Sequence, residues 1–345
     1  MKRLAKQGSA LLLAALLSIS LLAGCGQQTG TASAAASSAG ASGSAAAETT
    51  KVSVAALKGP TAMGMVKLMS DAEAGPVDGN DYTFTIAASP DEISPQLAQG
   101  ALDIACVPAN LAAVLYQKME GEVRVLAVNT LGVLYIVEKG DTVHSFADLK
   151  GKTICAAGKG STPEYALRYL LQKNGLDPDR DVNIVWKSEH AECVTALASG
   201  EETIALLPQP FVTTAEMKDT SIRTALDLNA AWDALGEKSS LITGAVIARQ
   251  DFIDEHADAV NRFLTQYAAS VNYVNTNTAD AAKLIEGYDI VPAAVAEKAL
   301  PDCHIVCITG KDMQEKLAGY LQTLYDQNPA AVGGALPDDA FYYGA

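Results

Sequence analysis

The chain has 345 residues, of which 49% are hydrophobic, and a formal net charge of −15. At roughly 100 to 200 residues per domain, this length suggests about two domains and is ample for a hydrophobic core. The acidic balance and the lack of a basic run argue against nucleic acid as a partner, because binding it requires clustered lysine and arginine.

Residues 1–24 predict a lipoprotein signal peptide. A start with three basic residues precedes the apolar run 10–22, which is too short for a membrane span of about 20 residues. The segment ends in "LAGC", residues 22–25, which resembles the lipobox of bacterial lipoproteins. We expect cleavage before Cys25 and lipidation of this residue. An uncleaved anchor is the alternative. Because −15 includes the three removed positive charges, the mature chain carries near −18.

Residues 25–50 comprise the lipidated cysteine and a stretch that contains no large apolar side chain. Such a stretch cannot bury enough surface to offset its chain entropy, so we expect a flexible tether. The protein should therefore work outside the cytoplasm, lipid-anchored to the outer face of a bacterial cell membrane.

The remaining cysteines are an odd number and cannot all pair. They are Cys106, Cys155, Cys193, Cys303 and Cys307. Cys106 and Cys155 lie in apolar runs and are expected in the core. Cys303 and Cys307 flank His304 and could bind a metal or form a local disulfide. Since no further His/Cys pair completes a tetrahedral set, we favour core packing and expect no metal; the pairing of these two stays open.

From Lys51 onward, apolar strand-like runs alternate with helical patterns. We expect strands at 52–57, 82–88, 103–107, 153–157, 182–186, 203–207 and 241–249. We expect helices at 62–69, 91–100, 110–118, 163–175, 191–200 and 211–217, then at Phe252–Asn277, Thr278–Glu286, Pro292–Leu300 and Lys311–Asp326. Alternation of this kind predicts parallel α/β architecture.

Two motifs recur in the same order. "AxKGxT" occurs at 56–61 and 157–162, and "GALDIACVP" at 100–108 matches "GEETIALLP" at 200–208. We therefore predict two similar lobes, each a mostly parallel sheet flanked by helices. Lobe 1 would comprise 51–130 plus 242–345, and lobe 2 would comprise 131–241. Two chain crossings, near Asn129–Gly132 and Ser240–Gly244, would form a hinge.

Ligands of open parallel sheets bind at the carboxyl ends of the strands. The candidate ligand-binding residues there are Gly59, Pro60, Thr61, Ser89, Asn110, Asn129, Thr130, Ser161, Thr162, Gln209 and Phe211. Hydroxyls, amides and helix-start N–H groups suit a small polar or anionic molecule. Lys58 and Lys159 could attract an anion, or could be solvated residues before a helix.

Neither nucleotide binding nor catalysis is indicated. Lys159 is followed by glycine, so "AAGKGST" lacks the spacing of a P-loop, whereas Ser161-x-x-Glu164 fits a capping box. His190 is the only histidine at a predicted strand end, and no nucleophile is identifiable beside it. We expect no catalytic residue and no cofactor.

Several segments resemble the periplasmic-binding-protein-like receptors of ABC importers. They are "SFADLKGKTI", "GKGSTPEYALRYLL", "NGLDPDRDVNIVW", "ALASG" and "LLPQPFVT". The nitrate/sulfonate/bicarbonate group is the closest branch, and the thiamine-precursor (NMT1/THI5-like) proteins are also similar. The resemblance covers nearly everything after Lys51. It implies a class II periplasmic-binding-protein-like fold and a monomeric receptor that closes on a small molecule. The receptor would deliver this molecule to a membrane permease driven by a cytoplasmic ATPase.

Departures from this family bear on the ligand. Many relatives carry an acidic residue where Gln209 precedes Pro210, and no arginine lies at the predicted strand ends that face the cleft. Both differences favour a larger organic ligand, such as a sulfonate, carboxylate or pyrimidine-like molecule, over nitrate or bicarbonate. An enzyme on the same fold, like the pyrimidine-precursor or menaquinone-pathway relatives, is an alternative against which the export signal argues. A receptor that reports ligand occupancy to a sensor is another.

Overall fold

The computed structural model describes residues 49–236 and 239–345. The expected signal peptide, the lipidation site Cys25 and nearly all of the tether lie outside these residues, so they stay predictions. Among the described helices, none combines the length and the apolar character that crossing a membrane would require.

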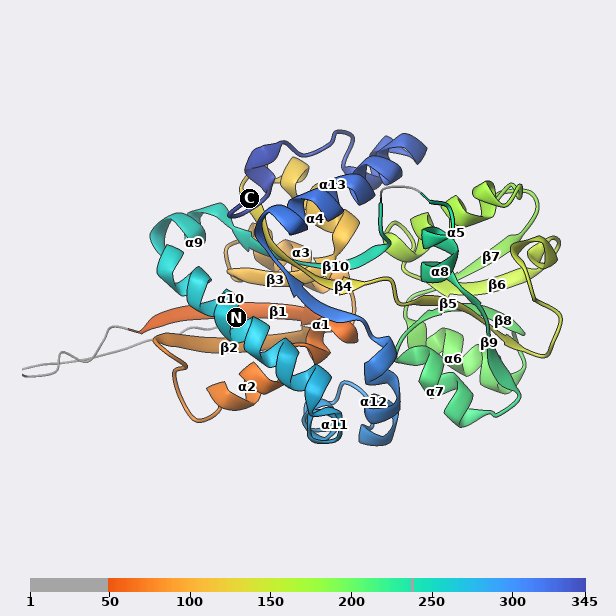
Figure 1. The fold of residues 1–345 in the computed structure, drawn as a ribbon, viewed down its shortest axis with the longest axis horizontal. Coiled ribbons are helices and arrows are strands. Elements are labelled where there is room, and N and C mark those ends of the chain that lie inside the picture. Colours follow the sequence, from red (N-terminus) through yellow and green to blue (C-terminus); the bar gives the residue numbers. More distant parts are fainter. Residues whose placement is uncertain (1–48, 237–238) are drawn as a thin grey trace, which may run out of the picture. The chain divides into compact units, whose positions relative to one another are not determined.

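The described chain forms two α/β lobes, each with one sheet covered by helices (Figure 1). The first sheet has the order β11-β4-β10-β3-β1-β2. Its strands are β1 (Thr50–Leu57), β2 (Asn80–Ala87), β3 (Ile104–Pro108), β4 (Val123–Leu131), β10 (Ile242–Arg249) and β11 (Ile305–Ile308). β1 pairs in parallel with β2 and β3, whereas β10 runs antiparallel to β3 and β4.

The second sheet repeats this arrangement with the order β7-β6-β8-β5-β9. Its strands are β5 (Leu134–Lys139), β6 (Thr153–Ala157), β7 (Asn183–Lys187), β8 (Ile204–Pro208) and β9 (Ile222–Asp227). β6 is parallel to β7 and β8, and β5 is antiparallel to β8 and β9. Five strands of the first sheet therefore match the second sheet in spatial order and in pairing direction. The matching orders are β2-β1-β3-β10-β4 and β7-β6-β8-β5-β9. The two-lobed α/β fold is confirmed; the sheets are mixed because β10 and β11 in the first sheet and β5 in the second oppose their neighbours.

Two crossings connect the sheets. The chain leaves the first sheet after β4 and enters the second as β5, and it returns between α8 (Leu228–Asp233) and β10. The strand that arrives directly from the other lobe, β10 in the first sheet and β5 in the second, thus runs antiparallel to both of its neighbours. We keep 51–130 plus 242–345 and 131–241 as our proposed lobe assignment.

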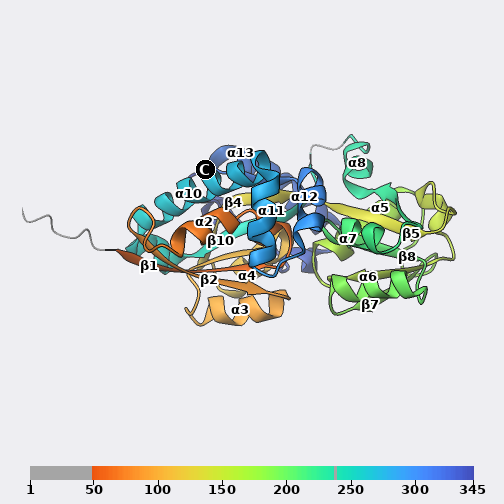
Figure 2. The ribbon, with the colours of Figure 1, turned by 90° about the horizontal axis from the view of Figure 1, so that it is seen from below.

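Helices surround both sheets (Figures 1 and 2). Those between strands are α1 (Pro60–Met63), α2 (Val66–Ala72), α3 (Pro90–Ala98), α4 (Ala109–Lys118), α5 (Thr162–Lys173), α6 (His190–Ser199) and α7 (Phe211–Lys218). The carboxyl-terminal third adds α9 (Gln250–Glu255), α10 (Ala257–Thr276), α11 (Thr278–Gly287), α12 (Ala293–Ala299) and α13 (Gly310–Gln327). The single helix expected over 252–277 is wrong: His256 has non-helical backbone angles (φ −136°, ψ 41°), so α9 ends and α10 begins there.

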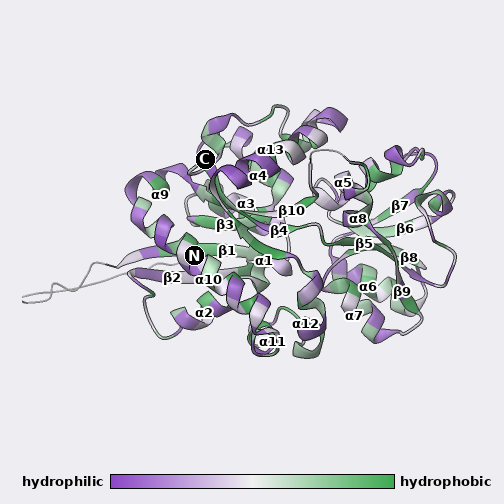
Figure 3. Ribbon diagram, in the orientation of Figure 1, coloured by the Kyte–Doolittle hydropathy of each residue, from purple (hydrophilic) through white to green (hydrophobic). Residues whose placement is uncertain are grey.

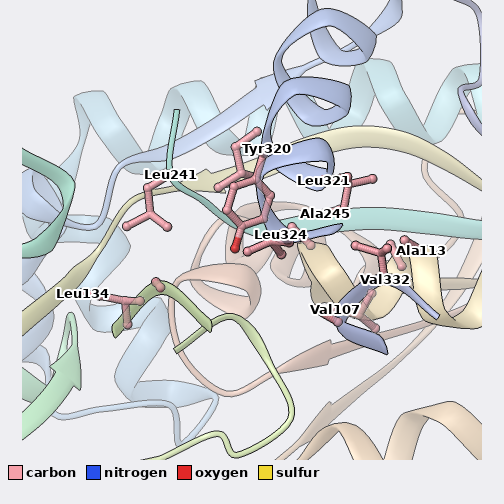
Figure 4. Close-up of a cluster of buried hydrophobic side chains, with 14 of the residues drawn as sticks. Val107, Ala113, Leu134, Leu241, Ala245, Tyr320, Leu321, Leu324 and Val332 are labelled. Carbon is pink, nitrogen blue, oxygen red and sulfur yellow. The ribbon is translucent and has the colours of Figure 1, made fainter. Parts of the chain in front are cut away.

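The strands are mostly hydrophobic, whereas the covering helices combine hydrophobic and hydrophilic residues (Figure 3). Buried side chains of strands and helices pack together in shared clusters, so the cores lie between sheet and helices. One core cluster extends through both lobes. It includes Leu134 of β5, Leu241 before β10 and Tyr320 of α13, which gather near the crossings (Figure 4). Apolar packing therefore joins the lobes near the two crossings.

The cysteines of the described residues are all free thiols. Cys106 and Cys155 are buried in β3 and β6, which confirms the core prediction. Cys303 is buried and Cys307 partly buried, and both pack in a core cluster with Ile305 of β11. Burial raises the pKa of the Cys303 thiol and brings that of Cys307 to about 11. Within 49–236 and 239–345, no group of side chains is arranged to hold a metal ion.

Candidate ligand-binding site

A cavity of about 890 Å³ lies where the strand ends of the two lobes meet. Residues that follow β1, β2 and β3 line one side, and residues that follow β6, β7 and β8 line the other. These strands are parallel within each lobe, so their carboxyl ends share an edge. The volume falls within the range of about 300–1,000 Å³ that is typical of small-molecule sites.

Most of the predicted residues border this cavity. Those that line it are Pro60, Thr61, Ser89, Thr130, Ser161, Thr162 and Phe211. Gly59, Asn110, Asn129 and Gln209 are not among the lining residues. Gly59 precedes α1 with φ 131°, in the region that favours glycine. Contact of any of these residues with a ligand stays a prediction.

The three predicted amide side chains are buried, and each accepts or donates a hydrogen bond within the protein. Asn110 donates from Nδ2 to the Ala331 carbonyl at 3.1 Å. Gln209 accepts through Oε1 from the backbone N–H and the hydroxyl of Thr213, at 3.3 and 2.9 Å. Asn129 is fully buried, its Oδ1 accepts from the Thr130 hydroxyl at 3.2 Å, and its Nδ2 has no hydrogen-bond partner among the described residues. These amides therefore support the walls of the cavity.

Two hydroxyls at the cavity are held by their own loops. Thr61 donates to the Leu57 carbonyl at 2.6 Å, which fixes the loop after β1. Ser89 forms a capping box with Glu92 at the start of α3. Both hydroxyl oxygens keep further hydrogen-bonding capacity.

The capping box expected at Ser161 and Glu164 does not form. Ser161 instead donates to the Gly158 carbonyl at 3.0 Å, and the Glu164 carboxylate accepts from the Gly160 N–H at 2.6 Å. Gly158 and Gly160 both have positive φ, so the loop turns and brings the Gly160 N–H, instead of that of Ser161, to the carboxylate.

Thr162 links the two lobes at the side of the cavity. Its hydroxyl donates to Asn110 Oδ1 at 3.3 Å and accepts from the Tyr320 hydroxyl at 3.4 Å. Asn110 Nδ2 also reaches the Gly160 carbonyl at 3.4 Å. Helices α4, α5 and α13 meet through these contacts, so the lobes are in direct contact beside the cavity.

Lysines supply most of the charge around the cavity. Lys58, Lys118 and Lys159 line it, and none has a carboxylate within 4.0 Å among the described residues; Lys187 pairs with Glu201 at 3.1 Å. Lys58 and Lys159 occupy equivalent positions in the repeated motif. In a chain of net charge −15, such a concentration of unpaired cations favours an anionic ligand.

Sequence reasoning missed Lys118 and the apolar wall next to it. Leu111, Leu115 and Lys118 follow one another at helical spacing on α4, and all three line the cavity. Pro95 and Ala98 of α3 complete this wall. The helical spacing of these three residues within the predicted helix 110–118 is the signal that could have identified this wall. The cavity thus combines polar strand ends and lysines with an apolar side.

The second lobe contributes an aromatic pair. The His190 and Phe211 rings, at the starts of α6 and α7, lie 5.3 Å apart between centroids, and both residues line the cavity. Burial lowers the pKa of His190 to about 4, so this histidine is neutral at pH 7.

Two similar α/β lobes with one cavity at their facing strand ends define a two-lobed ligand-binding protein. Residues 75–300 match the family model of the ABC transporter phosphonate periplasmic substrate-binding proteins. Because the match covers more than half of the chain, the chain belongs to this family. The predicted kinship with the receptors of ABC importers is thereby confirmed.

The curated relatives that match this chain have low sequence identity to it. The binding protein YtlA of Bacillus subtilis is 24% identical over 147 residues, which is 42% of either chain. A binding protein of Brucella abortus is 26% identical over 181 residues, 52% of this chain and 53% of its own. The chain therefore spans about half the length of the curated relatives that it matches.

Solved structures share the fold. An ABC transporter protein from Parabacteroides distasonis has a TM-score of 0.71 at 24% identity, covering 84% of this chain and 98% of its own. The alkanesulfonate-binding protein SsuA from Xanthomonas axonopodis pv. citri, bound to MOPS, has a TM-score of 0.65 at 19% identity, covering 85% and 96%. At these identities the likeness establishes the fold alone.

Gly244 of β10 provides a first test of the site. A methyl group there would overlap Asn129 Oδ1 and would lie 3.0 Å from Thr130 Oγ1 and Thr61 Cγ2. Asn129 is fully buried and cannot swing aside. We expect Gly244→Ala to lower the free energy of unfolding by about 1–3 kcal/mol and to displace the two threonines that line the cavity. Urea denaturation measures the first effect.

Gly287→Ala is the matched control, because a methyl group at Gly287 meets nothing within 4 Å and this glycine ends helix α11. We expect its stability to equal or slightly exceed that of the unmodified protein. Equal stability of the two variants would contradict the packing around Gly244.

Proposed function

We propose that this chain is the lipid-anchored, extracytoplasmic receptor of an ABC importer. It closes two lobes on a small organic anion and passes it to a membrane permease driven by a cytoplasmic ATPase. One observation carries the proposal: equivalent loops of the two lobes, 58–61 and 159–162, border one cavity, and each brings an unpaired lysine. A ligand that contacts both loops stabilises the closed arrangement.

The ligand is an organic anion larger than nitrate. A cavity of about 890 Å³ exceeds what a four-atom ion fills, and the apolar wall of α3 and α4 gives an attached carbon skeleton a surface to contact. Organic phosphonates, sulfonates and carboxylates combine such a skeleton with the charge that Lys58, Lys118 and Lys159 attract. The name of the matching family and the MOPS bound to the Xanthomonas protein support this class.

The chain acts as a receptor, not as an enzyme. Proteins of its family are described as substrate-binding components, and His190 has no hydrogen-bonded nucleophile among the described residues. One chain supplies both sides of the cavity, so a monomer suffices for binding.

Calorimetry on the purified full chain tests the proposal. The panel comprises butanesulfonate, MOPS, butylphosphonate, butyrate, nitrate and the neutral butyramide. We expect at least one organic anion to bind with one-to-one stoichiometry and butyramide not to bind. Binding of butyramide with no organic anion bound would overturn the proposal, and so would a panel without any binder.

Replacing both Lys58 and Lys159 by alanine should weaken the best organic anion of this panel about tenfold at low salt. The two ammonium groups attract the anion from opposite lobes, and their contribution is screened as ionic strength rises. Calorimetry at two salt concentrations measures the difference, which should shrink at the higher one.

Lys311→Ala controls for net charge, because Lys311 lies in the first turn of α13, is exposed and does not line the cavity. Its affinity for the anion should stay close to that of the unmodified protein. An equal loss in this variant would show that overall charge, not the position of the cavity lysines, governs binding.

A further inference from the structure

The crossing from β4 to β5 consists of Gly132 and Val133, and the two carbonyls of this crossing are held by different lobes. The Gly132 carbonyl oxygen lies 2.5 Å from Nδ1 of His304, a residue that precedes β11 of the first sheet. The Val133 carbonyl accepts from the backbone N–H of Gln209, which follows β8 of the second sheet, at 3.0 Å. Because the peptide group between them is planar, the only soft dihedrals that separate the two carbonyls are φ and ψ of Val133.

The chain before this point is fixed to the first lobe. Leu131, the last residue of β4, donates its N–H to the His304 carbonyl at 3.2 Å, and its carbonyl accepts from the Thr243 hydroxyl of β10 at 2.6 Å. The His304 ring extends this fixed stretch by one residue, to Gly132. A side chain is excluded at 132, since a methyl group there would overlap Asn229 Oδ1 of α8. Because glycine has more backbone freedom than any other residue, loss of the ring would give the crossing a second flexible position at Gly132.

His304 is itself held firmly by the first lobe. Cys303 and Ile305 on either side of it are buried in one core cluster, and the Ile305 carbonyl accepts from Asn275 Nδ2 of α10 at 2.9 Å. The backbone of His304 has φ 42°, which is uncommon for a residue other than glycine. Such a conformation persists only where the surrounding structure determines it. Since a carbonyl only accepts hydrogen bonds, Nδ1 carries a hydrogen and donates it to the Gly132 carbonyl.

We propose that His304 is a positioning residue for lobe closure: its Nδ1–H fixes the Gly132 carbonyl to the first lobe and confines the bending of this crossing to Val133. The inference rests on the proposed function, and it gives a role to the histidine between Cys303 and Cys307. His304 does not line the cavity, whereas Val133 does. If Gly132 bends as well, the lobes sample more open arrangements, and the smaller closed fraction lowers the apparent affinity for a ligand.

Two substitutions separate the ring of His304 from its backbone. In the full chain, His304→Gly keeps the positive φ accessible and removes the donor. His304→Asn keeps both, because asparagine also adopts positive φ and its Nδ2 occupies the place of Nδ1 relative to Cβ. Asp78→Gly is the matched control, since Asp78 is exposed, does not line the cavity and has a similar φ of 44°.

Hydrogen exchange of the ligand-free full chain, followed by mass spectrometry, tests the anchor without any ligand. We expect a peptide over residues 129–134 to exchange about fivefold faster in His304→Gly than in the unmodified protein, and within about twofold in His304→Asn and Asp78→Gly. Exchange of β7 should be the same in all of these proteins. Unchanged exchange at 129–134 in His304→Gly would overturn the inference. So would an equal acceleration in β7, or an equal acceleration at 129–134 in His304→Asn.

Calorimetry tests the consequence for closure, with butanesulfonate or whichever anion of the panel binds the unmodified protein more tightly. We expect His304→Gly to bind about fivefold more weakly than the unmodified protein and His304→Asn to bind within about twofold of it. Unchanged affinity in His304→Gly would show that the anchor has no part in closure and would overturn the inference. If the whole panel fails to bind the unmodified protein, the proposed function falls, and the exchange experiment alone decides whether His304 anchors the crossing.

Discussion

Trp232→Ala should lower the free energy of unfolding by about 3–5 kcal/mol. Trp232 is fully buried, and its ring lies 4.6 Å from that of Tyr169 and 5.7 Å from that of Tyr320, between centroids. Its Nε1 donates to the Ser239 carbonyl at 3.1 Å. The substitution removes the ring contacts, opens a cavity and leaves this carbonyl without its donor. Urea denaturation followed by circular dichroism measures the loss.

The position of Trp232 makes the loss relevant to closure of the lobes. It joins α8 and α5 of the second lobe to α13, close to the returning crossing. Trp232→Phe should cost less, because it keeps most of the ring contact and loses the hydrogen bond. Trp186→Ala is the second control, since Trp186 is only partly buried on the edge strand β7. A loss in Trp232→Ala no larger than in Trp186→Ala would contradict this account.

Local patterns were sufficient to predict the two-lobed fold. Strand periodicity and the recurring Lys58 and Lys159 motif are short-range properties, and they mark the same strand in both sheets, β1 and β6. Parallel strands end at one edge, so the sequence pattern alone was enough to assign Thr61, Ser89 and Ser161 to the cavity.

The directions in which the side chains point could not be predicted from these local sequence patterns. Asn110 follows β3 as expected, but its amide turns to the Ala331 carbonyl, 221 residues further along the chain. Gln209 bonds to Thr213 four residues on, so its amide closes a local turn. A position next to a strand end fixes where the backbone runs, whereas the rotamer depends on partners that the local pattern does not contain.

Pairing between distant segments was equally inaccessible. β10 lies between β3 and β4, and Tyr320 reaches Thr162 across 158 residues. Neither contact leaves a periodic trace in the sequence. The lobe-to-lobe contact beside the cavity, made by Thr162, Asn110 and Tyr320, therefore emerged from the structure, although two of these residues were already candidates.

Glu138→Gln should lower the free energy of unfolding by about 2–4 kcal/mol at pH 7. Glu138 lies in β5, the strand that enters the second lobe, and is 1% exposed. Its carboxylate accepts from the backbone N–H groups of Thr142 and Val143, at 2.9 and 3.1 Å, and pairs with Arg223 at 2.9 Å. A glutamine amide would turn one N–H toward these donors and remove the charge that faces the guanidinium. Chemical denaturation of both proteins gives the difference.

The pH dependence of this stability difference distinguishes the loss of the carboxylate charge from a mere change in side-chain packing. Burial by itself would raise the pKa of Glu138, but hydrogen bonds from Thr142 and Val143 and the charge of Arg223 outweigh it, so the pKa is lowered. A carboxyl whose folded pKa is depressed stabilises the fold fully above its unfolded pKa of about 4.3, and the stabilisation disappears as pH falls through the folded value. The difference between the two proteins should therefore be constant from pH 7 to pH 5 and shrink below about pH 4.

Asp141→Asn is the matched control: Asp141 pairs with the same guanidinium at 2.9 Å but is 76% exposed, so its loss should stay below about 1 kcal/mol. Equal losses in both variants would show that Arg223, and not the buried carboxylate, holds this end of β5.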